Sequence, residues 1–228
     1  MDSITKCLIL AGGLGTRLKS VSGDTPKPMM SIGNKAFLEI LIERLQKFNL
    51  SDINISISYN ADYFLNYFKN SNYNFIIEKE PLGTGGAIKY ALDKLGNFDQ
   101  VIILNGDTLF DINYQEMLLK HIINDADITI AAKIIQNPNR YGTLEIANNR
   151  ILKFVEKQEL SRGVINCGIY IVKKSIIQHL PDKDKFSFET DFLEKSTSNL
   201  KIVPYISDNY FIDIGIPEDY QKAVDYLT

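Results

Sequence analysis

The first half of the chain alternates short apolar segments with segments of helical periodicity, and this alternation restricts the possible folds more than any other feature. Residues 36–48, for example, carry apolar side chains at positions 37, 38, 41, 45 and 48, which is helical spacing. The expected strands are 4–10, 53–58, 73–78 and 101–107, and the expected helices are 36–48, 61–69 and 85–95. This order predicts an α/β fold with a doubly wound, mostly parallel Rossmann-like sheet and helices on both faces.

The second half mixes the two types of segment differently. The expected strands are 127–135, 141–146, 151–156 and 166–173, and the expected helices are 174–180, 188–196 and 217–227. Strands that follow one another without an intervening helix predict antiparallel additions to the sheet. Since the sequence shows no internal repeat, low-complexity linker or long charge run, we expect a single domain over residues 1–228.

Composition excludes several classes of protein. The net charge of −3 and the pI near 5.5 argue against a general nucleic-acid-binding surface. No apolar stretch reaches the length of a membrane span, and the N-terminus lacks the apolar core of a secretory signal, so we expect a cytoplasmic protein. Cys7 and Cys167 lie in apolar segments and are expected to be reduced core thiols. The two histidines and two cysteines do not have metal-ligand spacing, which argues against a structural zinc site.

Residues 12–28 follow the first strand with a glycine-rich loop that contains Arg17 and Lys27. It is not a Walker P-loop, because no Gly-Lys-Ser/Thr follows, and it is not a full dinucleotide fingerprint, because Leu18 replaces the third glycine. Glycines let backbone N–H groups approach an anion, and the prolines on both sides of Lys27 restrict the backbone there. The loop therefore favours phosphate binding over its alternative, a surface turn with solvated cations.

Seven further segments extend this pattern in order along nearly the whole chain. The opening loop contains GGLGTRL, and the segments that follow it are TPKPM, EPLGTGGAI, LNGDT, RYGTLEI, FVEK, NCGIY and YFIDIGIPEDY. Together they resemble the sugar-1-phosphate nucleotidyltransferases. The resemblance implies a single nucleotidyltransferase domain that joins a nucleoside triphosphate to a sugar 1-phosphate and releases pyrophosphate.

Finer similarities concern the substrates. LGTGGAIKYAL and FSFETDFLEK are similar to short family members that use GTP and D-glycero-α-D-manno-heptose 1-phosphate, which implies a GDP-heptose product for surface polysaccharides. The alternative substrates are N-acetylmuramate or hexose 1-phosphates with UTP or GTP. An alternative of another class is an inactive nucleotide-sugar-binding regulator, against which Arg17, Lys27, Asp107 and Asp213 together argue. A homodimer through a strand edge or the terminal helix is also expected.

Two aspartates are candidate metal ligands. Asp107 follows the apolar run VIIL, and Asp213 follows another short run in YFIDIG. Mg²⁺ is typically held by one or two carboxylates together with phosphate oxygens. The resemblance implies that Asp107 and Asp213 hold Mg²⁺, and that Arg17, Lys27 and Asp107 are catalytic. From the residues alone Asp107 is equally a turn aspartate, and Asp111 is a weaker competitor.

The segment EPLGTGGA, residues 80–87, is a second glycine cluster, placed where a strand meets a helix. It can flank a flat base, donate to another phosphate, or form only a tight helix entry. The resemblance favours recognition of the base and ribose, with Gly12 on the opposite side. The implied nucleotide-binding residues are Leu10, Ala11, Gly12, Gly13, Gly15, Thr16, Arg17, Leu82, Gly83, Thr84, Gly85, Asn105 and Gly106.

Glu156 and Lys157 end a predicted strand and can bind the hydroxyls and phosphate of a sugar phosphate. Without the resemblance such a pair is usually solvated. The resemblance implies an acceptor pocket made of Tyr141, Gly142, Glu156, Lys157 and Asn166, although Tyr141 can also simply cover the sheet. Phe186 and Phe188 are expected in the core.

Overall fold

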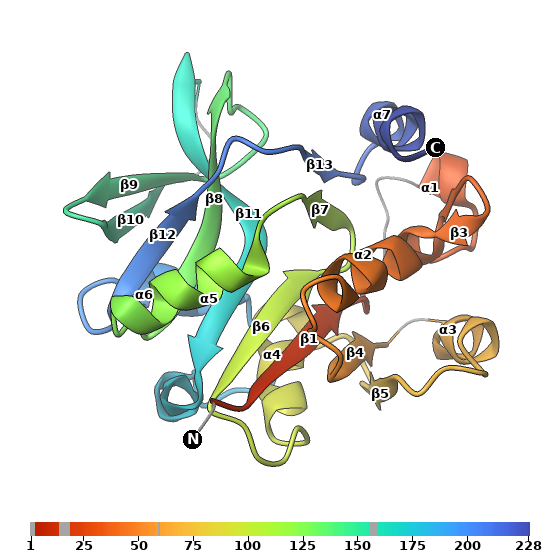
Figure 1. The fold of residues 1–228 in the computed structure, drawn as a ribbon, viewed down its shortest axis with the longest axis horizontal. Helices are drawn as coiled ribbons and strands as arrows, with labels where there is room; N and C mark the ends of the chain where they lie inside the picture. Colours follow the sequence, from red (N-terminus) through yellow and green to blue (C-terminus); the bar gives the residue numbers. More distant parts are fainter. Residues whose placement is uncertain (1–2, 14–18, 59, 156–158) are drawn as a thin grey trace.

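A parallel four-stranded unit forms the centre of the computed structural model, which describes residues 3–13, 19–58, 60–155 and 159–228. Its strands are β1 (Thr5–Leu10), β4 (Ile53–Ile57), β5 (Asn74–Ile77) and β6 (Gln100–Asn105), in the order β6-β1-β4-β5. The chain runs from β1 through β4 to β5 and then returns to the other side of β1 for β6 (Figure 1). The predicted doubly wound sheet is thus confirmed, and its strand order reverses between β1 and β6, where such sheets bind ligands.

Further strands extend this sheet beyond β6. The long strand β11 (Arg162–Lys173) pairs antiparallel with β6, β8 (Ile128–Gln136) and β9 (Thr143–Ala147), and β9 pairs antiparallel with β10 (Arg150–Val155). These pairings confirm the predicted antiparallel additions. One unpredicted strand, β12 (Ile202–Ile206), runs parallel to β8 at an edge, and it contains Pro204. Proline is tolerated there because an edge strand leaves one side of its backbone unpaired.

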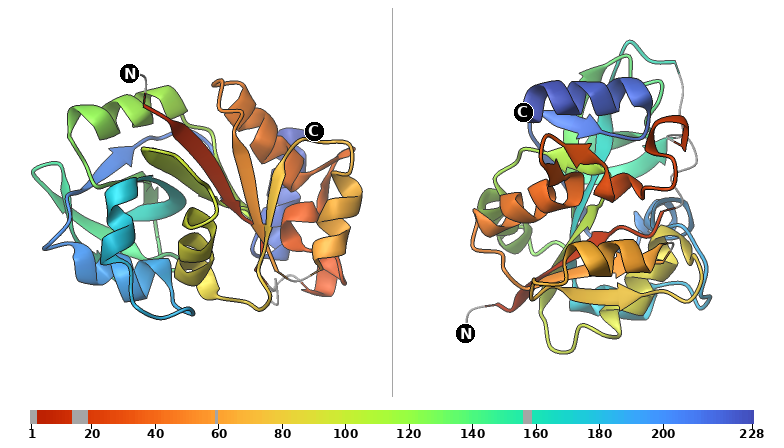
Figure 2. Two further views of the ribbon diagram at one scale, coloured as in Figure 1. Left: turned by 90° about the horizontal axis from the view of Figure 1, so that it is seen from below. Right: turned by 90° about the vertical axis from the view of Figure 1, so that its right-hand side faces the viewer.

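Helices cover both faces of the sheet (Figure 2). One face packs against α2 (Phe37–Gln46), α3 (Ala61–Tyr67) and α5 (Tyr114–Ile123), and the other against α4 (Gly83–Leu92), η3 (Lys174–His179) and η4 (Phe188–Leu193). Alternate side chains of β1 enter different clusters, with Cys7 and Ile9 on the first face and Leu8 on the second. A strand buried on both faces reads as a continuous apolar run, as residues 7–10 of β1 do.

A smaller layer stands beside the main sheet. Strands β7 (Thr108–Phe110) and β13 (Phe211–Asp213) pair antiparallel and pack with α7 (Pro217–Leu227), α2 and the short ribbon of β2 (Ser31–Ile32) and β3 (Lys35–Ala36). In Figure 1 this layer lies at the upper right, near the C-terminus. Its structural effect is to bring the segment after β6 next to a segment more than a hundred residues later.

Some expected elements differ in form. The opening loop contains a four-residue helix, α1 (Lys19–Ser22), and a 3-10 turn, η2 (Lys27–Met29). The segment expected as a helix over 174–180 is the 3-10 helix η3, and the segment 188–196 is the π-helical η4 followed by α6 (Glu194–Ser196). π-Helical turns are often found at functional sites. No helix in the described part of the chain has the length and apolarity that a membrane span requires.

The two cysteines occupy the core, as predicted. Both are buried and free, and burial raises the pKa of the Cys7 thiol to about 12. Phe186 and Phe188 are also buried, which confirms their assignment to the core.

Candidate active site

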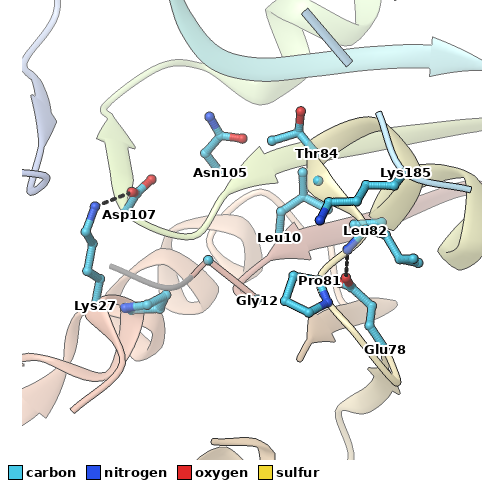
Figure 3. Close-up of a pocket in the computed structure, with 14 residues that line it drawn as sticks. Leu10, Gly12, Lys27, Glu78, Pro81, Leu82, Thr84, Asn105, Asp107 and Lys185 are labelled. Carbon is cyan, nitrogen blue, oxygen red and sulfur yellow. Dashed lines mark hydrogen bonds and ion pairs between the residues drawn. The ribbon is translucent and has the colours of Figure 1, made fainter. Parts of the chain in front are cut away.

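The carboxyl ends of β1 and β6 open into a cavity. Leu10 and Asn105 end these two strands and are register partners, so the chain leaves both strands at the same edge of the sheet. The cavity has a volume of about 470 Å³ (Figure 3). Its lining residues are Leu10, Gly12, Gly13, Lys27, Pro28, Glu78, Pro81, Leu82, Gly83, Thr84, Ala87, Asn105, Asp107 and Lys185.

Lys27 and Asp107 form one end of this cavity. The Lys27 Nζ lies 3.4 Å from Asp107 Oδ2, and Lys27 is only 8% exposed. The prolines on both sides of Lys27 fix its 3-10 turn, in which the Met30 amide donates to the Lys27 carbonyl. A buried ammonium at the mouth of two strands is suited to bind an anion.

Asp213 lies beside Asp107 through the β7–β13 ladder. Asp213 is the register partner of Thr108, and the Ile214 amide donates to the Asp107 carbonyl at 3.0 Å. Asp213 also accepts a hydrogen bond from the Gly215 amide through Oδ1, at 2.7 Å. The fold therefore brings together the two aspartates that the sequence predicted as partners.

The N-terminus of α4 binds a distant segment of the chain as well as lining the cavity. The Gly85 amide donates to the Phe186 carbonyl at 2.9 Å, and a Cβ on Gly85 would lie 2.2 Å from the Phe186 ring. The Thr84 hydroxyl donates to Glu189 at 2.7 Å and accepts from the Phe188 amide. The tight helix entry considered from the sequence is therefore present, together with cavity lining by Leu82, Gly83 and Thr84.

A second cavity of about 460 Å³ adjoins the first, and Asn105 lines both. Tyr141, Gly142 and Asn166, which were predicted for the acceptor pocket, line this second cavity. The Oδ1 atom of Asn105 is buried and has no hydrogen-bond partner within the described residues. The two cavities thus meet at a polar side chain that the folded chain leaves unsatisfied.

Tyr170 and Glu189 also line the second cavity, and the sequence predicted no role for either of them. The Tyr170 hydroxyl accepts a hydrogen bond from the side-chain amide of Asn166 at 2.9 Å and donates one to Glu189 at 3.0 Å. Glu189 also accepts a hydrogen bond from the Thr84 hydroxyl. Burial, together with the nearby Glu189, raises the pKa of Tyr170 well above its usual value. This network links the walls of the two cavities. The quoted segments NCGIY and FSFETDFLEK contain these residues, but no spacing rule relates them to each other.

The remaining predicted residues fall into two groups. Ala11, Gly85 and Gly106 are adjacent to the lining residues but do not line the cavity themselves. Five others lie outside the described residues, so their roles stay predictions: Gly15, Thr16, Arg17, Glu156 and Lys157. Glu78 and Lys185 line the first cavity and were not predicted.

The family model for nucleotidyl transferases matches residues 6–228, and the chain belongs to this family. D-glycero-alpha-D-manno-heptose 1-phosphate guanylyltransferase of Aneurinibacillus thermoaerophilus is 45% identical over 96% of this chain and 96% of its own length. The enzyme of the same name from Campylobacter jejuni is 42% identical over 94% of this chain and 96% of its own.

Solved structures agree with this result. The crystal structure of HddC from Yersinia pseudotuberculosis superimposes with a TM-score of 0.88 at 43% identity, covering 99% of this chain and all of that one. Its complex with GMP-PN gives a TM-score of 0.87. The family resemblance and the fold expected from the sequence are both confirmed.

Proposed function

We propose that this protein transfers GMP from GTP onto D-glycero-α-D-manno-heptose 1-phosphate, giving GDP-heptose and pyrophosphate for surface polysaccharides. The observation that carries the proposal is the pair of adjoining cavities that meet at Asn105, beside Lys27 and Asp107. Two cavities of similar size provide separate places for the nucleotide and the acceptor sugar phosphate. The substrates follow from the heptose 1-phosphate guanylyltransferases that share 45% and 42% identity with the chain.

The reaction requires little acid–base chemistry. The second pKa of a phosphate monoester is about 6, so the attacking oxygen is largely deprotonated at pH 7. This oxygen forms a bond to the α-phosphorus of GTP while the bond to pyrophosphate breaks in line. The chain must hold two polyanions together and stabilise the negative charge of the transition state. Lys27 supplies a fixed positive charge at one end of the first cavity, and Arg17 is proposed to supply a second.

The donor set at Asp107 and Asp213 fits Mg²⁺. Asp213 ends β13 and Asp107 directly precedes β7, its partner strand, and no group of three or more ligating side chains occurs among the described residues. Mg²⁺ commonly binds through one or two carboxylates and completes its octahedron with phosphate oxygens and water. When bound, the ion would neutralise charge on the α-phosphate and orient it. Asp107 and Asp213 would hold it, and Lys27 would keep Asp107 in place until substrate arrives.

The second cavity is the proposed acceptor site. Tyr141, Gly142 and Asn166 line it, and Glu189 presents a carboxylate that accepts hydrogen bonds. Glu156 and Lys157 are proposed to bind the hydroxyls and the phosphate of the same sugar. Because GTP and sugar phosphates are cytoplasmic metabolites, we place the activity in the cytoplasm. Assembly as a homodimer stays a prediction, which sedimentation equilibrium tests.

Pyrophosphate release tests the proposal. The purified protein with Mg²⁺ is assayed with four nucleoside triphosphates against heptose, mannose, glucose and N-acetylmuramate 1-phosphates. We expect the highest kcat/KM for GTP with the manno-heptose phosphate, and loss of that activity in Asp107→Asn. Preferred turnover of another pair would refute the proposed substrates and retain the reaction class. Tight binding of a nucleotide sugar without turnover of any pair would favour the regulator.

A further inference from the structure

The first cavity carries charged side chains at two ends (Figure 3). Lys27 and Asp107 form the end described above. At the other end, around Leu82, stand Glu78 and Lys185, for which the phosphate chemistry provides no role. Since the triphosphate is placed at the Lys27 end, the opposite end is left for the base.

Glu78 is a buried acceptor in the wall of this end. It follows β5 directly and is 5% exposed. Its Oε1 accepts from the Ser56 hydroxyl at 2.9 Å, and its Oε2 accepts from the Leu82 amide at 3.3 Å. An ionised carboxylate offers about four acceptor positions, so these two bonds leave capacity for a ligand. Burial raises the pKa of this carboxyl, and the hydrogen bonds from Ser56 and Leu82 act against that rise.

Gly12 brings the backbone of the opening loop directly over this carboxylate. A Cβ at Gly12 would lie 3.2 Å from Glu78 Oε1 and 2.9 Å from the Ser58 hydroxyl, so a side chain there would displace its neighbours. The Gly12 backbone and the Leu82 amide therefore both lie against the Glu78 carboxylate, and all three residues line the same cavity. A flat ring that enters between Gly12 and Leu82 presents its edge to Glu78.

Lys185 comes to the same end from a segment held by backbone hydrogen bonds. The next residue, Phe186, donates through its amide to the Leu82 carbonyl at 3.0 Å and accepts from the Gly85 amide at 2.9 Å. In Figure 3 the Lys185 side chain extends over the cavity towards Leu10 and Leu82. The base end therefore combines one buried carboxylate with one exposed ammonium.

We propose that Glu78 selects guanine by accepting hydrogen bonds from its N1–H and N2–H₂ groups, and that Lys185 donates to its O6 atom. The inference rests on the proposed guanylyl transfer. Guanine presents two donors and one acceptor in a row along one edge, and a carboxylate next to an ammonium complements that row. Adenine presents a lone pair at N1 to the carboxylate, and uracil presents one N–H between two carbonyl oxygens. Both are therefore rejected.

The experiment compares kcat/KM for GTP and ITP in the wild-type protein, Glu78→Gln and the control Glu43→Gln. ITP lacks only the N2 amino group. Hydrogen bonds to charged groups are strong enough that the wild-type protein should prefer GTP by about tenfold. In Glu78→Gln we expect kcat/KM for GTP to fall about 10- to 100-fold, and the GTP/ITP ratio to approach one. The Glu43 side chain is 41% exposed and lines neither cavity, so Glu43→Gln should keep both values.

The ratio separates selection from a purely structural role. If Glu78 only holds the Leu82 loop, Glu78→Gln lowers GTP and ITP turnover equally and the ratio stays unchanged, which would overturn the inference. Lys185→Met should lower kcat/KM for GTP and for ITP by the same factor, because both bases carry O6. If neither value changes, Lys185 has no part in base selection. Equal use of GTP and ITP by the wild-type protein also refutes it, whether or not Glu78→Gln folds. Preference for UTP would instead refute guanylyl transfer itself.

Discussion

Replacing Lys27 by Met should remove most of the activity while preserving the fold. Lys27 is 8% exposed and its Nζ lies 3.4 Å from Asp107 Oδ2, at one end of the first cavity. Two unit charges about 4 Å apart interact by about 4 kcal/mol at an effective dielectric constant of about 20. In Lys27→Met, a phosphate that becomes more negatively charged in the transition state would lose this interaction with the ammonium. Removing one preorganised charge-stabilising group generally costs about 10²- to 10³-fold in kcat, and we expect that loss here.

Stability should change little in Lys27→Met. The methionine side chain has a similar length, the Met30 amide still donates to the residue 27 carbonyl, and Asp107 keeps a side chain that is 33% exposed. We therefore expect the free energy of unfolding to change by no more than about 1 kcal/mol. The assay is the initial rate of pyrophosphate release at saturating GTP and heptose phosphate, together with urea unfolding.

Lys35→Met provides the matched control. Lys35 pairs with Glu43 on the surface and both side chains are about 40% exposed, so its loss should leave kcat unchanged. A loss below fivefold in Lys27→Met, or an equal loss in Lys35→Met, would refute the assignment of Lys27 as the charge-stabilising group.

Three further predictions concern the metal site, the helix entry and the core. Asp107→Asn should lower the rate at least 100-fold and raise the Mg²⁺ concentration for half-maximal rate; an unchanged Mg²⁺ titration would contradict the metal assignment. Gly86→Ala should destabilise the protein by about 1–3 kcal/mol, because its methyl group would lie 2.0 Å from the Asp184 carbonyl oxygen, and a wild-type melting temperature would disprove the close approach. Burial lowers the pKa of His121 to about 4, so the unfolded chain binds the extra proton first as the pH falls. Stability should therefore be lost between pH 6.5 and 4, by about 3 kcal/mol, and His121→Gln should flatten this dependence in urea unfolding.

Local patterns were sufficient to predict the parallel core. Strands buried on both faces, such as residues 7–10 of β1, appear as continuous apolar runs whatever surrounds them, and α2 shows its periodicity within its own residues. Edge and short strands have weaker patterns. Strand β12 contains Pro204, and β7 and β13 have three residues each, so neither alternation nor an apolar run identifies them.

The candidate site could be predicted where it lies in contiguous motifs. Lys27, Asp107 and Asp213 follow apolar runs or prolines, and the structure places them at one edge of the fold. Glu78 and Lys185 are more than a hundred residues apart in the chain, and Glu189 is 105 residues from Thr84. Their contacts depend on how the segment around Phe186 docks on α4, which no local pattern encodes.

The attachment of the β9–β10 hairpin has a consequence for how this family diversifies. The hairpin is paired with β11 through one residue pair, Ile165 and Thr143. By contrast, β11 is paired with β6 through five consecutive residue pairs. Tyr141 and Gly142, directly before β9, line the second cavity and do not line the first. Evolution can therefore remodel the hairpin, and with it the choice of sugar, while the nucleotide half retains its geometry. Exchange of residues 141–155 between family members is thus a rational way to obtain enzymes that use the same nucleotide with a different sugar 1-phosphate.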